Sequence, residues 1–161
     1  MKRTIDILTT IEGAIATLAY SCVAILLMGD VIGRELFGIS VLGIKTVAVY
    51  VAIVAGFLGL VLATHHNAHL RPEIFDHLIT GRRGAMFDRI GDLLSGLFFL
   101  FLAGYAIYFV GQTRAAGDRA AVLYFLLWPI QLIIPYAFLS SALRHFAFCV
   151  SPILKSKSQD R

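Results

Sequence analysis

The chain alternates between long apolar runs and short polar segments. Four of the apolar runs approach the length of about 20 residues that a helix needs to cross a bilayer, and charged residues border each of them. This pattern predicts an all-α integral membrane protein with four transmembrane helices. We expect residues 1–161 to form a single membrane domain. The predicted spans are 13–33, 41–64, 93–112 and 120–150.

The second span carries small residues four apart, a spacing that places them on one helix face. Such faces let neighbouring helices approach closely in a membrane. The span then ends abruptly in the polar, basic segment HHNAHLR. The two rows of small residues are Ala48, Ala52 and Gly56, and Ala55, Gly59 and Ala63.

A longer polar segment separates the second and third spans. Within it, Ile74, Phe75, Leu78 and Ile79 recur at helical spacing. Pro72 is suited to the first turn of a helix. We therefore expect a short amphipathic helix over residues 72–80, lying on the membrane surface.

The fourth span allows two interpretations, because it contains two prolines. In the first, Pro129 occupies the first turn of a helix and residues 120–128 lie along the membrane interface. In the second, one long helix crosses the membrane with a kink at Pro135. The sequence leaves both open.

Composition supports the membrane interpretation. Hydrophobic residues make up 58% of the chain and charged residues 15%, against about a quarter charged in a soluble domain. The net charge of +4 does not indicate nucleic-acid binding, since the basic residues flank the spans rather than forming one patch. Cys22 and Cys149 each lie in an apolar run, form no paired motif and are expected to behave as small hydrophobes.

The distribution of lysine and arginine predicts the orientation. With both termini in the cytoplasm, ten of these residues lie inside and four outside, which agrees with the positive-inside rule. We expect a multi-pass membrane protein whose first helix is retained. The inside set is Lys2, Arg3, Arg71, Arg82, Arg83, Arg89, Arg144, Lys155, Lys157 and Arg161, and the outside set is Arg34, Lys45, Arg114 and Arg119.

The histidines after the second span invite a metal or haem interpretation. His65 and His69 are four apart, so one helical face could present both to a metal. The cluster also includes His66 and His77, but no acidic residue or cysteine completes a closed site with it, and each of these four histidines lies at or beyond a predicted span end. We expect an interfacial polar turn and no cofactor. No nucleophile–base pair or phosphate-binding loop suggests an enzyme.

Ionisable residues inside a span would mark an ion or substrate path. Asp30, Lys45, Asp92 and Arg144 all fall near predicted span ends. We therefore expect this chain to have no translocation path of its own.

Charges near the outer end of the first span have two interpretations. Asp30 and Arg34 are four apart and can form a local ion pair on one helix face. Alternatively, Arg34, Glu35 and Lys45 form part of an outward-facing docking surface.

The order of these features resembles the DctQ-type small membrane subunit of tripartite ATP-independent periplasmic (TRAP) transporters. The resemblance extends from about Ile11 to Phe146. It rests on Asp30-Val31-Ile32-Gly33-Arg34 at the end of the first helix, Phe57-Leu58-Gly59 in the second, the turn His69-Leu70-Arg71 with Glu73, and Pro129, Pro135 and Leu143-Arg144 in the last.

One region departs from the family pattern. Members usually carry one or two glutamates, often after a tryptophan, at the entrance of the second helix. Leu42, Lys45 and Thr46 occupy that region here. If those acidic residues contact a partner in relatives, Lys45 implies a changed contact.

The resemblance implies a non-catalytic subunit that scaffolds a large permease, which holds the substrate and sodium sites. A periplasmic binding protein would deliver a small organic acid anion, a carboxylate or sulfonate. The alternative function is a haem-binding four-helix anchor of a respiratory oxidoreductase; a stand-alone channel would need a polar lining. The resemblance makes the small-residue faces a predicted interface with the large subunit, formed by Ala52, Gly56, Gly59, Ala63, Pro129 and Pro135.

Overall fold

The computed structural model describes residues 2–39, 42–65 and 82–150 of the chain. Most residues within these ranges are helical, and four stretches are long and apolar enough to cross a membrane. This confirms the predicted all-α fold with four transmembrane helices. The interfacial helix predicted over 72–80 lies outside the described residues. The helices are α1 (Lys2–Phe37), α2 (Ile44–His65), α3 (Arg82–Ala116), α4 (Trp128–Gln131) and α5 (Ile133–Val150).

Helices α1 and α3 extend beyond the predicted spans. With 36 residues, α1 has a length of about 54 Å, whereas the hydrocarbon core of a bilayer is about 30 Å thick. Helix α3 has 35 residues. Both helices must therefore tilt or extend into the polar layers. The extension of α1 to Lys2 brings residues before Gly13 into the helix.

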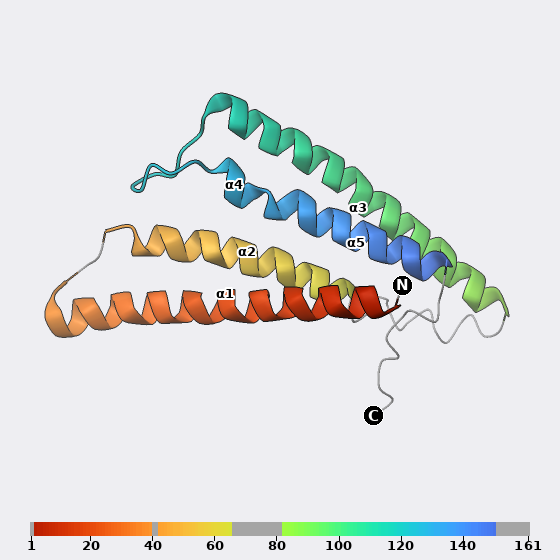
Figure 1. Ribbon diagram of the computed structural model, residues 1–161, viewed down its shortest axis with the longest axis horizontal. Coiled ribbons are helices and arrows are strands. Elements are labelled where there is room, and N and C mark those ends of the chain that lie inside the picture. The colour runs from red at the N-terminus through yellow and green to blue at the C-terminus, as the bar shows by residue number, and fades with distance from the viewer. Residues whose placement is uncertain (1, 40–41, 66–81, 151–161) are drawn as a thin grey trace.

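A glycine turn connects α1 to α2. Gly38 has φ 62°, a left-handed conformation that suits glycine at the end of a helix. Its N–H donates to the carbonyl of Arg34 at 3.1 Å, and the N–H of Ile39 donates to the carbonyl of Gly33 at 3.0 Å. These two bonds satisfy carbonyls that the helix end would otherwise leave free. Helices α1 and α2 lie side by side as an antiparallel pair (Figure 1).

The two prolines of the last span each lie in the first turn of a helix. Pro129 is at the start of α4, and Pro135 is the third residue of α5. The first turn needs no intrahelical N–H donor, so proline is tolerated there. Residues before Trp128 are not helical, which agrees with the first of the two interpretations of this span. The kinked helix running through residues 120–150 is not observed.

The four long helices form an open layer in the order α1, α2, α5, α3. Helix α1 packs along α2, α2 along α5, and α5 along α3. Figure 1 shows α1 and α2 as one pair and α3 and α5 as another. We call α1 with α2 the N-terminal hairpin and α3 with α5 the C-terminal hairpin. Among the described residues, the two hairpins pack against each other mainly where α2 lies along α5, and we call this contact the α2–α5 seam.

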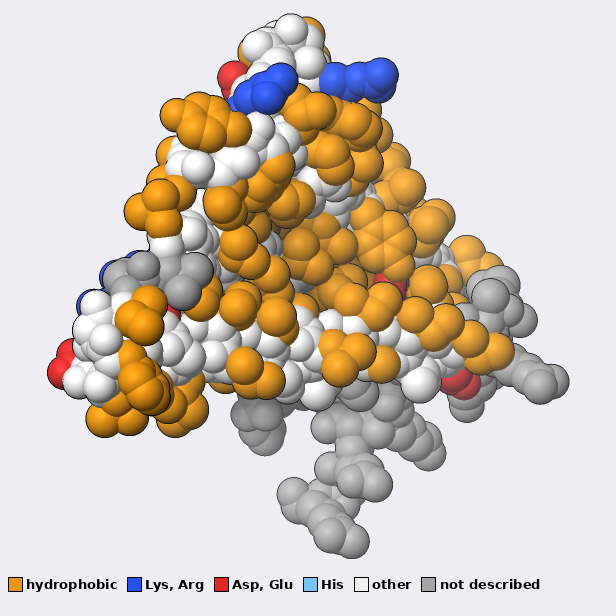
Figure 2. Space-filling model, turned by 60° about the vertical axis from the view of Figure 1, so that its left-hand side comes forward, with side chains coloured by type: hydrophobic (Ala, Val, Ile, Leu, Met, Phe, Trp, Pro, Cys, Tyr) orange, Lys and Arg blue, Asp and Glu red, His pale blue; other side chains and the backbone are white. Residues whose placement is uncertain are grey.

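The seam is tight at one end and open at the other. In Figure 1 the hairpins converge where α1 begins and α5 ends, and they diverge where α1 ends and α2 begins. We call these the inner end and the outer end. At the outer end an apolar pocket of about 180 Å³ separates α2 from α4. Figure 2 shows apolar side chains over the two arms and the hollow between them.

Small residues allow close packing inside each hairpin. A Cβ at position 59 would lie 3.8 Å from the hydroxyl of Tyr20, so Gly59 faces α1. A Cβ at position 96 would lie 2.9 Å from the ring of Phe146, which is too close for any side chain without movement. Gly96 thus allows α3 and α5 to approach each other.

Candidate partner-binding surface and buried polar clusters

A buried ion pair joins the first helix to the last. Glu12 in α1 is 2% exposed and Arg144 in α5 is 3% exposed. The Nη2 of Arg144 donates to Oε2 of Glu12. Both residues lie inside stretches that qualify as membrane spans. Arg144 lies near the end of its span, as predicted, whereas Glu12 precedes the predicted first span of residues 13–33 but lies inside α1, which begins at Lys2.

Two hydroxyls of α5 complete the hydrogen bonding of Glu12. Tyr136 donates to Oε1 of Glu12 at 2.6 Å, and Ser140 donates to the same oxygen at 3.3 Å. A carboxylate with this many donors is well stabilised in a medium without water. We call Glu12, Tyr136, Ser140 and Arg144 the inner polar cluster.

The same turn of α5 also bonds to α2. Nη1 of Arg144 donates to the carbonyl of Val61 at 2.8 Å, and the hydroxyls of Thr64 and Ser141 lie 3.2 Å apart. Thr64 and Ser141 are almost completely buried. The hydrogen bond to the carbonyl of Val61 holds the guanidinium of Arg144 against α2.

An acid–base pair joins α5 to α3. Nδ1 of His145 lies 3.6 Å from Oδ1 of Asp92 in α3, and both residues are buried. The imidazole ring stacks on Phe99, with the ring centroids 5.5 Å apart and an interplanar angle of 12°. Residues 140–145 of α5 therefore make polar contacts with α1, α2 and α3. This turn is the centre of the inner end.

Sequence reasoning missed Glu12, and the available signal was weak. Arg144 is 132 positions away, so no local spacing relates the two charges. The usable signal was depth: each charge lies a short way from the inner end of its span. Opposite charges at similar depth in two spans favour a pair, because each is costly alone in a membrane.

A second set of charges lies at the outer end. Nε of Arg34 lies 3.3 Å from Oδ2 of Asp30, and Nζ of Lys45 lies 4.0 Å from the same oxygen. The Asp30 side chain is 3% exposed, whereas those of Arg34 and Lys45 are 41% and 65% exposed. The predicted local pair of Asp30 with Arg34 is thus present. Lys45 adds a link from α2 to α1, and Glu35, which follows Arg34 in α1, is exposed.

The segment between α3 and α4 folds into a short turn at the outer end, and it contacts the N-terminal hairpin there. Arg119 and Leu126 form a β-bridge, and Val122 and Tyr124 at the tip have φ of 76° and 55°. For a β-branched residue such as Val122 this conformation is strained. The segment presents exposed apolar side chains at its tip. We call residues 119–126 the outer loop.

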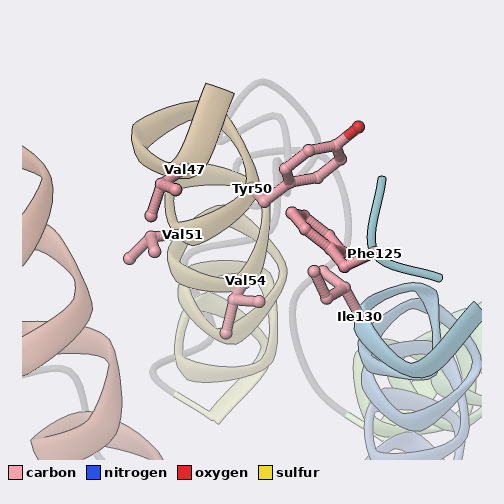
Figure 3. A pocket seen from close by; sticks show the side chains of 6 residues that line it. All are labelled: Val47, Tyr50, Val51, Val54, Phe125 and Ile130. Atoms are coloured by element: carbon pink, nitrogen blue, oxygen red, sulfur yellow. The ribbon is translucent and has the colours of Figure 1, made fainter. Parts of the chain in front are cut away.

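The outer loop contacts α2 through apolar side chains. The side chain of Leu123 lies against Gly43, where a Cβ would come within 2.9 Å of it. The rings of Tyr50 and Phe125 meet edge to face with centroids 5.3 Å apart. Figure 3 shows the rings of Tyr50 and Phe125 next to each other. The pocket is lined by Val47, Tyr50, Val51, Val54, Phe125 and Ile130.

Helix α2 keeps one stripe uncovered in the middle of the layer. Lys45, Val49, Ile53 and Gly56 are exposed and fall on one side of the helix, which we call the open α2 stripe. A Cβ at position 56 would meet nothing within 4 Å. Beside Gly56 lies an open hollow of about 290 Å³, lined by Ile53, Gly56, Phe57 and Leu60.

The residues predicted to face a large subunit fall into different environments. Gly56 belongs to the open α2 stripe and Ala52 is half-buried beside it. Pro129 is exposed at α4, whereas Pro135 is buried in α5. Gly59 faces α1, and Ala63 is half-buried. The structure thus does not bring the six residues together on one face.

Several predicted residues cannot be located. His69, Arg71 and Glu73 of the family-motif turn, and His66 and His77, lie outside the described residues. The helix α2 ends at His65. Among the described residues, no group of three or more metal-ligating side chains comes together.

Comparisons with known proteins agree with the resemblance found in the sequence. Residues 23–154 match the family described as tripartite ATP-independent periplasmic transporters, DctQ component. The chain is also similar to the ectoine TRAP transporter small permease protein TeaB of Halomonas elongata. The two are 28% identical over 144 residues, which cover 88% of this chain and 74% of the relative. No solved structure matches the chain.

Proposed function

Because the chain belongs to the DctQ component family of tripartite ATP-independent periplasmic transporters, we propose that it scaffolds a large permease subunit that binds the substrate. The chain is a small permease component and a multi-pass protein of the inner membrane. The observation that supports the scaffold role best is the open layer. In this layer the central helix α2 buries Ala48, Ala55 and Val61 and keeps the open α2 stripe uncovered on another side, where a partner helix could pack.

The proposed contact with the large subunit centres on Gly56. Its missing side chain and the hollow beside it leave room for a side chain of a partner helix. Tight packing of this kind is the main source of affinity between helices in a lipid environment. Ala52 extends the contact along α2, and Pro129 would contribute from α4. Gly59 instead serves packing against α1.

Transport by this complex is proposed to be coupled to sodium and to carry a small organic acid anion. The family resemblance supports this assignment, and in this proposal the substrate and sodium sites belong to the large subunit. The relative from Halomonas elongata is named for ectoine. We expect both termini of this chain in the cytoplasm, since the lysine and arginine count favours that orientation.

Co-purification with the large permease tests the scaffold role. Gly56→Leu should reduce recovery of the large subunit by about tenfold or more, because a bulky side chain fills the contact. Gly104→Leu is the matched control, since Gly104 in α3 is also exposed with nothing within 4 Å of a Cβ. Equal recovery from both variants would show that the open α2 stripe faces lipid, and a stable chain that never retains a large permease would contradict the scaffold role itself.

A second proposed contact is with the periplasmic binding protein at the outer end. Arg34, Glu35 and Lys45 would form part of it. Asp30 offsets part of the charge of Arg34 and Lys45, so we expect this contact to affect the association rate more than the affinity. Lys45→Glu should slow uptake a few-fold at low salt and less at high salt. Unchanged uptake at low salt would reject this contact.

A further inference from the structure

The open layer raises the question of what holds its two hairpins together. Each hairpin is packed internally over a long helix pair, α1 with α2 and α3 with α5. Among the described helices, the main contact between the hairpins is that of α2 with α5, and side chains of α5 also reach Glu12 of α1. In lipid there is no hydrophobic driving force between apolar helices, so an association that depends on this seam needs specific contacts.

The apolar part of the seam includes an aromatic contact and an open pocket. Phe57 of α2 meets Phe138 of α5 edge to face with centroids 5.8 Å apart. Further toward the outer end, the pocket of about 180 Å³ opens between α2 and α4. A void of this size removes contacts that close packing would supply.

The polar part of the seam is dense and reaches across both hairpins. Arg144 of the C-terminal hairpin bonds to Glu12 on α1 and to the carbonyl of Val61 on α2. In the described residues, every hydrogen bond from a side chain to the Glu12 carboxylate comes from α5. The N-terminal hairpin thus carries a buried carboxylate whose partners all belong to the other hairpin.

Each member of this pair is costly without the other. A lone carboxylate or guanidinium at membrane depth is strongly disfavoured, and breaking a buried pair by removing one partner leaves that charge uncompensated. Removing both charges is far less harmful, because neither then lacks a partner. Such a pair therefore determines which helices associate, and it contributes less to the net stability of each helix.

We infer that the Glu12–Arg144 pair is a lock that joins the N-terminal hairpin to the C-terminal hairpin. It sets the register between α1, α2 and α5 and thereby the shape of the open layer. When the lock is broken, each hairpin stays formed and the two separate along the α2–α5 seam.

Crosslinking across the seam tests the lock. Thr64→Cys with Ser141→Cys places two thiols at side chains whose hydroxyls lie 3.2 Å apart, within reach of a disulfide or a short bifunctional thiol reagent. The background carries Cys22→Ser and Cys149→Ser, because both native cysteines are free. The full chain is crosslinked in native membranes and the yield is read from the mass shift. Glu12→Gln alone, and Arg144→Gln alone, should each lower the yield by about tenfold or more.

Two comparisons distinguish a lock from general damage. The double variant Glu12→Gln/Arg144→Gln should recover most of the yield, since no unpaired charge remains. Gly13→Cys with Leu62→Cys reports on the N-terminal hairpin, where a Cβ at position 13 would lie 3.7 Å from the Leu62 side chain. Its crosslink should persist in both single variants.

Three results would overturn the inference. One is an unchanged yield across the seam in both single variants. Another is a double variant as defective as the singles. The third is an equal loss of the crosslink inside the N-terminal hairpin, which would show that the pair supports the whole fold rather than the joint between hairpins.

Discussion

The two ends of the α2–α5 seam join the hairpins by different means. At the inner end, hydrogen bonds and the Glu12–Arg144 ion pair link α1, α2 and α5. At the outer end, the outer loop lies against α2 through Leu123 and Phe125, and a pocket remains beneath it. Inside a membrane the polar junction is directional and depends on both partners, whereas the apolar junction is non-directional and tolerates gaps. The difference predicts a fixed inner end and a more adaptable outer end.

Breaking the inner junction should have the largest effect. Arg144→Gln leaves the Glu12 carboxylate buried with only hydroxyl donors. We expect the free energy of unfolding to fall by about 3–5 kcal/mol, which is the usual cost of removing one member of a buried ion pair. The measurement is the midpoint of thermal unfolding of the purified chain in mild detergent, together with its level in the membrane. Normal values for both would mean that water or lipid headgroups reach Glu12.

Breaking the outer junction should have an intermediate effect. Phe125→Ala removes the ring that meets Tyr50 and enlarges a pocket that already exists. Phe125 is only half-buried, so we expect a loss of about 1–2 kcal/mol, less than for a phenylalanine in a closed core. The same unfolding measurement applies. A loss as large as that of Arg144→Gln would remove the distinction between the two ends.

Removing one hydroxyl from the inner polar cluster should have the smallest effect. Tyr136→Phe deletes the donor at 2.6 Å from Glu12 but leaves the ion pair with Arg144 in place. We expect the free energy of unfolding to fall by about 0.5–1.5 kcal/mol, which is the usual net contribution of a hydrogen bond, or by somewhat more because the acceptor is charged. Ser140→Ala, which removes a weaker bond at 3.3 Å, is the matched comparison and should cost less. The opposite ranking would show that Ser140 is the main hydroxyl donor.

Much of the fold could be predicted from hydrophobic pattern, because length and apolar character decide whether a segment crosses a bilayer. The number of spans, the local pair of Asp30 with Arg34 and the proline at the start of the last span follow from short-range spacing. The family resemblance followed from the order of motifs along the chain. Each of these signals lies within one segment or in the sequence of segments.

The inner polar cluster could not be predicted in the same way. Glu12 lies before the uncharged run that defined the first span, so that run alone placed the helix start too late. Its pairing with Arg144 depends on how helices from opposite ends of the chain pack, which no periodicity encodes. The two rows of small residues on α2 were visible, but the sequence did not show that Gly59 faces α1 while Gly56 stays open.

The most direct test of the scaffold role is an experimental structure of this chain bound to its large permease in a lipid nanodisc. We predict a helix of the large permease seated on the open α2 stripe at Gly56, with Glu12 and Arg144 in contact within this chain. Lipid density along that stripe, with the large permease bound to another face, would contradict the proposed interface.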